Sequence, residues 1–253
     1  MKNQSDHSND CGGDKDKLFA TAIDNINGFT FDDKVVSVFT DMIDRSVPGY
    51  ATTINMIGML AQRYAQQDTS LYDLGCSLGA ATFSMGHQVA TSGCDIISID
   101  NSSSMIAKCK ENLLCSSMAM PVTFLVEDIT SSDITNASVI VLNFTLQFIP
   151  KEKRTALLQT IYNGLRKGGI LIISEKICFD DDHLNALLID LHHNFKKAKG
   201  YSSLEISQKR NALENVLIPE TIDVHKSRLN GIGFNSVDVW FQCMNFASMV
   251  AIK

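Results

Sequence analysis

The chain has 253 residues, of which 45% are hydrophobic and 20% are charged, as expected for a globular protein large enough to bury a full core. Its formal net charge of −6, without a Lys/Arg-rich stripe, argues against a surface that grips nucleic acid. No run approaches the ~18 apolar residues of a membrane span, so no membrane association is predicted.

The first 17 residues are polar and contain no apolar segment that could serve as a signal peptide. We expect residues 1–17 to form a disordered tail ahead of a single domain over residues 18–253. The seven cysteines are odd in number and include no C-x-x-C pair. This pattern predicts no metal site and favours reduced thiols in a cytoplasmic protein.

Two apolar helical segments precede the first predicted strand. Helical spacing runs from Asp32 to Arg45, and the break at Pro48-Gly49 separates it from a second helix over residues 51–64. Residues 18–66 are therefore predicted to form an N-terminal helical cap.

Short strands and helices alternate from residue 70 onward. Gly168-Gly169 is expected to end the third of these helices. The alternation predicts a parallel sheet with helices on both faces. The predicted strands cover residues 71–74, 95–100, 122–127, 137–143 and 170–175, and the helices cover 80–90, 104–114 and 151–165.

A predicted helical insertion over residues 180–218 interrupts the alternation. A further helix over residues 219–230, with Pro219 in its first turn, precedes strands at 235–241 and 246–252 that are close enough to pair antiparallel. The predicted fold class is α/β, a Rossmann-like, seven-stranded, mostly parallel sheet with helices on both faces.

The segment after the first predicted strand has two interpretations. Gly75 to Gly79 spell G-x-S-x-G, the elbow that presents a nucleophilic serine, Ser77 here, in α/β-hydrolases. That elbow follows several earlier strands, whereas residues 71–74 form the first predicted strand here, so a hydrolase is disfavoured. In the alternative, Gly75 and Gly79 let the backbone turn tightly beside a cofactor.

Asp100 ends the next strand, where a carboxylate can accept hydrogen bonds from both hydroxyls of a ribose. A serine at the middle position hinders the close approach that a pyrophosphate needs. This favours S-adenosylmethionine, which has no phosphate, over a dinucleotide. Asp73 is expected to be structural, and the adjacent His192 and His193 point apart on a helix, so we expect one packed and one exposed ring.

With these positions placed, the chain is similar to the class I S-adenosylmethionine-dependent methyltransferases. From about Leu18 to Lys253 it resembles, more closely, the carboxy-S-adenosyl-L-methionine synthase family. Six segments carry this resemblance: FDDKVVSVFTDMIDRSVPGY, YDLGCSLGAAT, IDNSSSMI, VLNFTLQFI, HHNFKKAKGYSSLEISQKRNALENV and WFQCMNFASMVAIK.

The resemblance implies a homodimeric enzyme, without a metal, that converts S-adenosylmethionine and prephenate to carboxy-S-adenosylmethionine, phenylpyruvate and water. It also implies that a downstream tRNA carboxymethyltransferase uses the product to modify a wobble uridine. The ligand-contacting positions of the family fall on Tyr50, Gly75, Cys76, Ser77, Asp100, Asn101, Asp128, Ile129, Asn143 and Arg210.

Arg210 is the predicted catalytic residue, because a guanidinium stays charged and matches the transferred carboxylate with two parallel hydrogen bonds. Asp128 is expected to accept from the adenine amino group, and Tyr50 to contact the amino-acid or carboxyl end of the ligand. Asn143 closes the fourth strand, at the edge where open α/β sheets bind ligands. Two alternatives stay open here: an ordinary methyltransferase that acts on a small molecule, and a non-enzymatic cofactor-binding protein.

Overall fold

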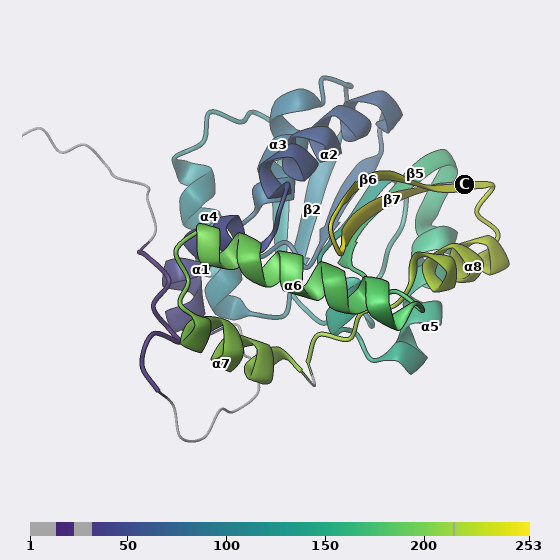
Figure 1. Cartoon of the computed structure of the whole chain (residues 1–253). Coiled ribbons are helices and arrows are strands. Elements are labelled where there is room, and N and C mark those ends of the chain that lie inside the picture. Colours follow the sequence, from purple (N-terminus) through teal and green to yellow (C-terminus); the bar gives the residue numbers. More distant parts are fainter. Residues whose placement is uncertain (1–13, 23–31, 215) are drawn as a thin grey trace, which may run out of the picture.

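Seven strands form one sheet at the centre of the computed structural model, which describes residues 14–22, 32–214 and 216–253 (Figure 1). The strand order is β3-β2-β1-β4-β5-β7-β6, in which β1 to β5 run parallel and the last two pairings are antiparallel. This arrangement confirms the predicted fold class. The strands are β1 (Ser70–Leu74), β2 (Asp95–Asp100), β3 (Val122–Val126), β4 (Ala137–Asn143), β5 (Leu165–Lys176), β6 (Ser236–Cys243) and β7 (Phe246–Ile252).

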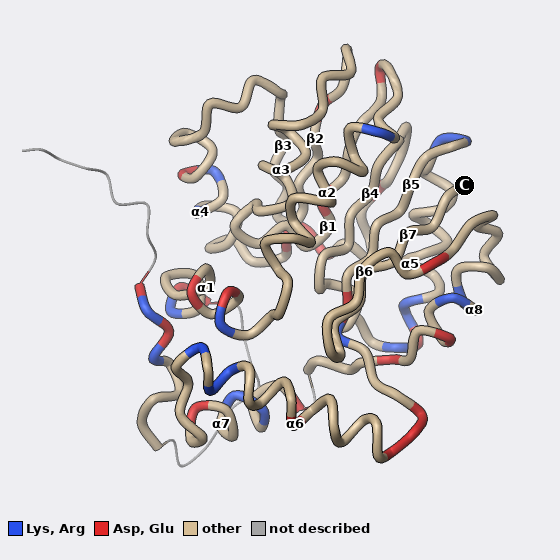
Figure 2. The backbone as a smooth tube through the Cα atoms, turned by 45° about the horizontal axis from the view of Figure 1, so that its top comes forward, with Lys and Arg blue, Asp and Glu red and all other residues tan. Residues whose placement is uncertain are grey.

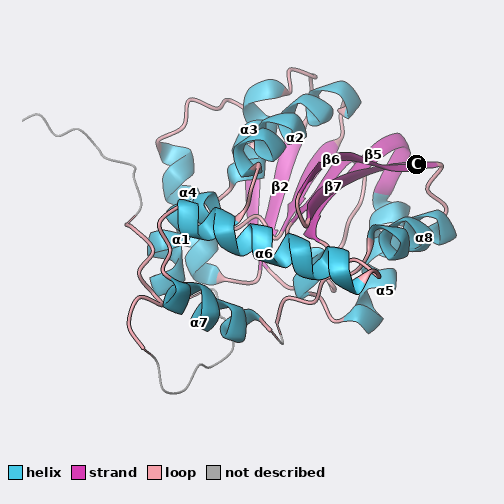
Figure 3. Cartoon of the chain, viewed as in Figure 1, coloured by secondary structure: helices cyan, strands magenta, loops and turns pink. Residues whose placement is uncertain are grey.

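Helices cover both faces of the sheet, as the colouring by secondary structure in Figure 3 shows. On one face, Ile57 of α2 (Tyr50–Tyr64) and Met85 of α3 (Ala80–Gln88) pack against side chains of β1, β4 and β5. On the other face, α5 (Lys151–Gly164) and α8 (Ile222–Ile232) pack against the alternate side chains of the same strands. Because both faces of β4 are covered, its continuous apolar run is fully buried.

Three helices lie at the carboxyl ends of the parallel strands. They are α1 (Asp33–Ser46), α6 (Asp182–Ala198) and α7 (Ser203–Leu213), and Figure 1 shows α6 crossing in front of the sheet with α7 beside it. Each begins at a side-chain cap, namely Asp32, Asp181 and Ser202. The remaining elements are α4 (Ser103–Leu114), which packs beside β2 and β3, and a 3₁₀ turn, η1 (Leu146–Phe148).

Two sequence-based boundaries are wrong. The helix α5 ends at Gly164, and Gly168-Gly169 lie inside β5, where the pairing with β4 shifts register and Gly168 takes a φ of 77°. Gly168, with its left-handed backbone, thus allows an irregularity within β5 and does not end α5. Pro219 lies ahead of α8, which begins at Ile222 behind its cap Thr221.

The predicted tail is also wrong at its carboxyl end. Asp16 is only 2% exposed, its backbone N–H donates to Asp41, and the hydroxyl of Tyr201 donates to its carboxylate. Asp16 is therefore packed against α1 and against Tyr201 ahead of α7, although Asp14, Lys15 and Lys17 are exposed. Residues 1–13 lie outside the described part of the chain. Residues 23–31 of the predicted N-terminal cap also lie outside the described part of the chain. The helix α2, which was predicted to belong to this cap, packs instead on one face of the sheet.

Among the described residues no helix is long and apolar enough to cross a bilayer. Six cysteines lie in that part of the chain, and all six are free thiols.

Leu142→Ala is expected to lower the free energy of unfolding by about 2–5 kcal/mol, because deleting a buried side chain loses its transfer energy and leaves a cavity. Leu142 is 0% exposed at the centre of the sheet. Urea unfolding measures the change. The matched control is Leu114→Ala, at a residue 88% exposed, which should change stability by less than about 0.5 kcal/mol. Equal effects of the two substitutions would contradict this account of the core.

Candidate functional site

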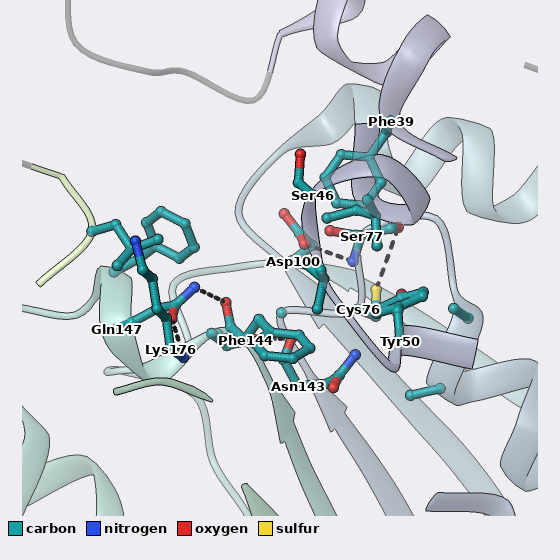
Figure 4. Close-up of a pocket in the computed structure, with 18 of the residues that line it drawn as sticks. Phe39, Ser46, Tyr50, Cys76, Ser77, Asp100, Asn143, Phe144, Gln147 and Lys176 are labelled. Atoms are coloured by element: carbon teal, nitrogen blue, oxygen red, sulfur yellow. Dashed lines mark hydrogen bonds between the residues drawn. The ribbon is translucent and has the colours of Figure 1, made fainter. Parts of the chain in front are cut away.

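A cavity opens at the carboxyl ends of β1 to β5, beneath α1, α6 and α7 (Figure 4). It lies where the strand order reverses between β1 and β4, the place where open α/β sheets bind ligands. Its empty volume is about 1400 Å³, the solvent at its mouth included. Nine of the ten predicted site residues line this cavity: Tyr50, Gly75, Cys76, Ser77, Asp100, Asn101, Asp128, Ile129 and Asn143.

The turn after β1 is shaped by its glycine and anchored to β2. Gly75 has a φ of 80°, and a Cβ at this position would collide with the side chain of Thr145. The backbone N–H groups of Gly75 and Cys76 both donate to the carbonyl of Ile99, at 2.8 and 3.0 Å. A hydrogen bond with the thiol of Cys109, together with burial, raises the pKa of Cys76, so this thiol stays protonated.

Asp100 holds the next residue of the turn. The N–H of Ser77, a residue with a φ of 48°, donates to one carboxylate oxygen of Asp100 at 2.9 Å, and the N–H of Ser102 donates to the other at 2.9 Å. Burial raises the pKa of Asp100. Each carboxylate oxygen keeps a further lone pair, so the group can accept two more hydrogen bonds from a ligand.

Asp73 proves structural, as predicted. One of its carboxylate oxygens accepts from the N–H of Thr82 at 2.9 Å and from the hydroxyl of Thr82 at 2.7 Å. Burial raises the pKa of Asp73 to about 6, against the opposing effect of these hydrogen bonds. The aspartate therefore ties the end of β1 to the first turn of α3.

At the end of β4, a polar atom is left for a ligand. The side-chain carbonyl oxygen of Asn143 is buried and has no hydrogen-bond partner among the described residues. An unsatisfied buried acceptor is costly, so a donor from a bound molecule would stabilise it. Phe144 follows with a φ of 59°, and its ring lies 6.3 Å from that of Tyr50. Burial raises the pKa of Tyr50, which keeps the phenol neutral.

Two predicted residues come from the end of β3. Asp128 accepts from the backbone N–H of Thr130 at 2.8 Å, and hydrogen bonds with Thr130 lower the pKa of its carboxyl. Ile129 is buried beside it. Ionised Asp128 can accept from an amino group, and Ile129 offers a flat apolar contact, which together suit a heterocyclic base.

Arg210 is the predicted site residue that does not line this cavity. It is exposed on α7, beside a separate small depression that His193 and Lys197 also line. Its neighbour Lys209 lines the cavity instead. His192 is buried as expected, and its Nε2 lies 2.8 Å from the carbonyl of Ser46. His193 was expected to be exposed but is half-buried.

The sequence analysis missed three lysines of the cavity, Lys176, Lys196 and Lys209. Lys176 was detectable, because it ends β5 just as Asp100 and Asn143 end β2 and β4. No group of three His, Cys, Asp or Glu side chains suited to a metal gathers anywhere in the described ranges.

Comparisons with known proteins agree with this geometry. Residues 71–169 match the model of the family described as a methyltransferase domain. The carboxy-S-adenosyl-L-methionine synthase of Aliivibrio fischeri is 59% identical over 238 residues, covering 94% of this chain and 98% of the relative. The chain belongs to the carboxy-S-adenosyl-L-methionine synthase family. The predictions of this family and of an enzyme are thereby confirmed.

Solved structures show the same fold at low identity. A methyltransferase from Methanococcus maripaludis, titled as dependent on S-adenosyl-L-methionine, has a TM-score of 0.59 at 19% identity and covers 90% of this chain and 95% of its own. Human N-acetylserotonin methyltransferase, solved in complex with S-adenosylmethionine, has a TM-score of 0.60 at 18% identity and covers 87% of this chain and 55% of its own. At such identities the comparison supports the fold class of this synthase family member.

Gly75→Ala is expected to destabilise the protein by about 1–3 kcal/mol, because an alanine must adopt a left-handed backbone and also displace Thr145. Thermal unfolding and calorimetric binding of S-adenosylhomocysteine measure the effects, and affinity should fall by about tenfold or more as the turn moves. Gly231→Ala is the matched control, since open space surrounds Gly231 on α8. Parental stability and affinity in Gly75→Ala would refute the assigned role of the turn.

Proposed function

We propose that the protein converts S-adenosylmethionine and prephenate to carboxy-S-adenosylmethionine, phenylpyruvate and water. The observation that carries this proposal is the convergence of nine family ligand positions in one cavity at the switch point of the sheet.

The geometry supports one orientation for S-adenosylmethionine, here a substrate. Asp100 would accept from the two ribose hydroxyls with its free lone pairs, and Asp128 from the adenine amino group beside Ile129. The unpaired carbonyl oxygen of Asn143 would accept from the ammonium group of the amino-acid moiety. The sulfonium would then lie near the end of β4, between the ends of β2 and β5.

The proposed reaction forms one carbon–carbon bond. Prephenate loses its ring carboxylate as CO₂ and its hydroxyl as hydroxide, and the ring becomes aromatic, which drives the reaction. The departing hydroxide takes a proton from the sulfonium methyl and becomes water. The resulting ylide attacks CO₂ and becomes the carboxymethyl group, so no protein general base is required.

The protein would contribute proximity and exclusion of water. The cavity walls support this role, because apolar side chains of α1, the β4–α5 connection and β7 surround the proposed position of the sulfonium. They include Met42, Val47, Phe144, Phe148 and Phe246.

We further propose that the protein acts as a homodimer in which a second copy covers α6 and α7. Only His192 and Lys196 are buried among the 17 residues of α6, which leaves most of a long amphipathic helix uncovered. Its exposed leucines lie at helical spacing, and Leu204 of α7 is also exposed. The leucines of α6 are Leu184, Leu187 and Leu191.

Such a dimer bears on the role proposed for Arg210, which is to hold the transferred carboxylate once it has been captured on the sulfonium methyl. Burial lowers the pKa of Lys176, and the charge of Arg210 adds to this decrease, although Arg210 itself is exposed in the single chain. Either α7 turns toward the cavity of its own chain, or Arg210 of one copy enters the cavity of the other.

The product would carry an activated carboxymethyl group to a downstream tRNA carboxymethyltransferase that modifies a wobble uridine. A net charge of −6 supports the proposal that this chain makes the donor and does not itself bind the RNA. We place the protein in the cytoplasm, where the tRNA and both substrates are found.

Incubation of the protein with S-adenosylmethionine and prephenate is expected to yield a product heavier than S-adenosylmethionine by one CO₂ unit, together with an equal amount of phenylpyruvate. Mass spectrometry measures both products. S-adenosylhomocysteine is the control, because it lacks the sulfonium methyl and cannot be carboxylated. Formation of S-adenosylhomocysteine with an acceptor, without any dependence on prephenate, would instead identify an ordinary methyltransferase.

Arg210→Lys is expected to lower the rate of carboxylated-product formation by about tenfold or more, because an ammonium cannot form the two parallel hydrogen bonds of a guanidinium. A parental rate would remove Arg210 from the mechanism.

Co-expression of the Arg210→Lys chain with an Asp100→Ala chain then shows which subunit of the dimer supplies the guanidinium to each cavity. If Arg210 acts across the dimer, the mixture should recover about a quarter of the parental activity, because half of a random mixture is heterodimer with one complete site. If Arg210 acts within its own chain, the mixture should not exceed the residual activity of Arg210→Lys, since neither chain holds a complete site.

A further inference from the structure

Three lysines converge on one end of the cavity from three separate elements. Lys176 is the last residue of β5, Lys196 lies in the last turn of α6, and Lys209 lies on α7. Lys196 is 8% exposed and Lys209 is 5% exposed, so both ammonium groups are largely withdrawn from solvent. Figure 2 shows basic residues gathered where the carboxyl end of α6 runs beside α7.

Only one of these lysines has an anionic partner in the described part of the chain. The ammonium of Lys209 lies 3.5 Å from the carboxylate of Asp16 and donates to the hydroxyl of Ser46 at 3.1 Å. Lys176 and Lys196 have neither an ion pair nor a side-chain hydrogen bond among the described residues. The cluster therefore holds more positive charge than its surroundings neutralise.

An excess of buried positive charge is unfavourable unless an anion joins it. Burial and the neighbouring Lys209 and Lys176 lower the pKa of Lys196 to about 7. Burial lowers the pKa of Lys209 to about 8, while Asp16 opposes this decrease. A bound carboxylate would stabilise the charged form of both side chains.

The opposite end of the cavity has the opposite charge. Asp73 lies near the end of β1, Asp100 ends β2 and Asp128 follows β3, all on one side of β4, whereas Lys176 ends β5 on the other side. Figure 4 shows Lys176 at the left of the pocket and apart from Asp100, with Phe144 between them. The acidic side suits the hydroxyls, amines and sulfonium of an adenosyl ligand, and the basic side suits a separate anion.

We propose that Lys176, Lys196 and Lys209 form the subsite for the second substrate and hold the carboxylate that this substrate keeps throughout the reaction. This proposal rests on the proposed function, in which prephenate has two carboxylates. Cations paired with the carboxylate that leaves as CO₂ would stabilise the ground state and slow the reaction. The pyruvyl carboxylate, which phenylpyruvate retains, is therefore the group assigned to the lysines.

The test is calorimetric titration of prephenate and of phenylpyruvate into protein saturated with S-adenosylhomocysteine, which cannot react. Lys196→Met keeps the shape of the side chain and removes its charge. It should weaken binding of both acids by about tenfold or more, while the affinity for S-adenosylhomocysteine stays within about twofold of the parental value. Lys197→Met, one residue along α6 and exposed, is the matched control and should bind all three compounds as the parent does.

Three results would overturn the subsite. They are parental affinity of Lys196→Met for both acids, an equal loss of affinity for S-adenosylhomocysteine, and a loss confined to prephenate. The second would assign the lysines to the amino-acid carboxylate of the adenosyl ligand, and the third would assign them to the carboxylate that leaves.

A turnover assay distinguishes a failure of the proposed lysine subsite from a failure of the proposed function. If the parent forms carboxylated product and Lys196→Met has the parental KM for prephenate, the subsite is wrong and the function stands. If the parent binds both acids through Lys196 but forms no carboxylated product, the function is wrong and the subsite stands.

Discussion

The hydrogen bond between the backbone N–H of Ser77 and the carboxylate of Asp100 is the contact on which the site depends. It joins the turn after β1 to the end of β2 and fixes a residue whose backbone lies in the left-handed region. Gly75 allows the turn, Asp73 holds its far side to α3, and Asp100 supplies an anion directed at the cavity. A strained turn with this much support is pre-organised, so a ligand does not have to order it.

The order of the strands then distributes charge along the cavity. Because β1, β2 and β3 lie on one side of β4 and β5 lies on the other, the residue type at the end of each strand decides the local charge. Carboxylates lie at or near the ends of the first three strands, and an ammonium lies at the end of the fifth. A parallel sheet thus presents one row of positions at which two substrates of unlike charge can lie next to each other.

Most of the sheet could be predicted from the sequence, but its irregularities could not. Continuous apolar runs such as that of β4 determine a buried strand by themselves, and β2, β4 and β7 have the predicted boundaries. The bulge at Gly168 arises from pairing with β4, which no local pattern records. The site residues at the ends of these strands could also be predicted. Once the strands are known, the parallel topology alone brings their carboxyl ends together at one edge of the sheet.

The basic end of the cavity could not be predicted in this way. Lys176, Lys196 and Lys209 meet only through the packing of α6 and α7, and helical spacing does not indicate where those helices lie. Adjacent residues on a helix point about 100° apart, so a modest rotation of α7 decides whether Lys209 or Arg210 faces the cavity. The family resemblance indicated correctly that the α7 segment contributes to the cavity. Which of its side chains faces the cavity depends on how α7 packs in the tertiary structure.

Asp16 connects the cavity to a part of the chain that precedes all the helices and strands found in the described residues. Its carboxylate, shared between Tyr201 and Lys209, is the counter-ion of a lysine that lines the basic end. A version of the protein shortened to α1, or one with a fusion partner joined directly ahead of that helix, would remove this counter-ion and admit water to Lys209. Expression designs for this family should therefore begin well upstream of the first helix, even though the sheet itself does not need those residues.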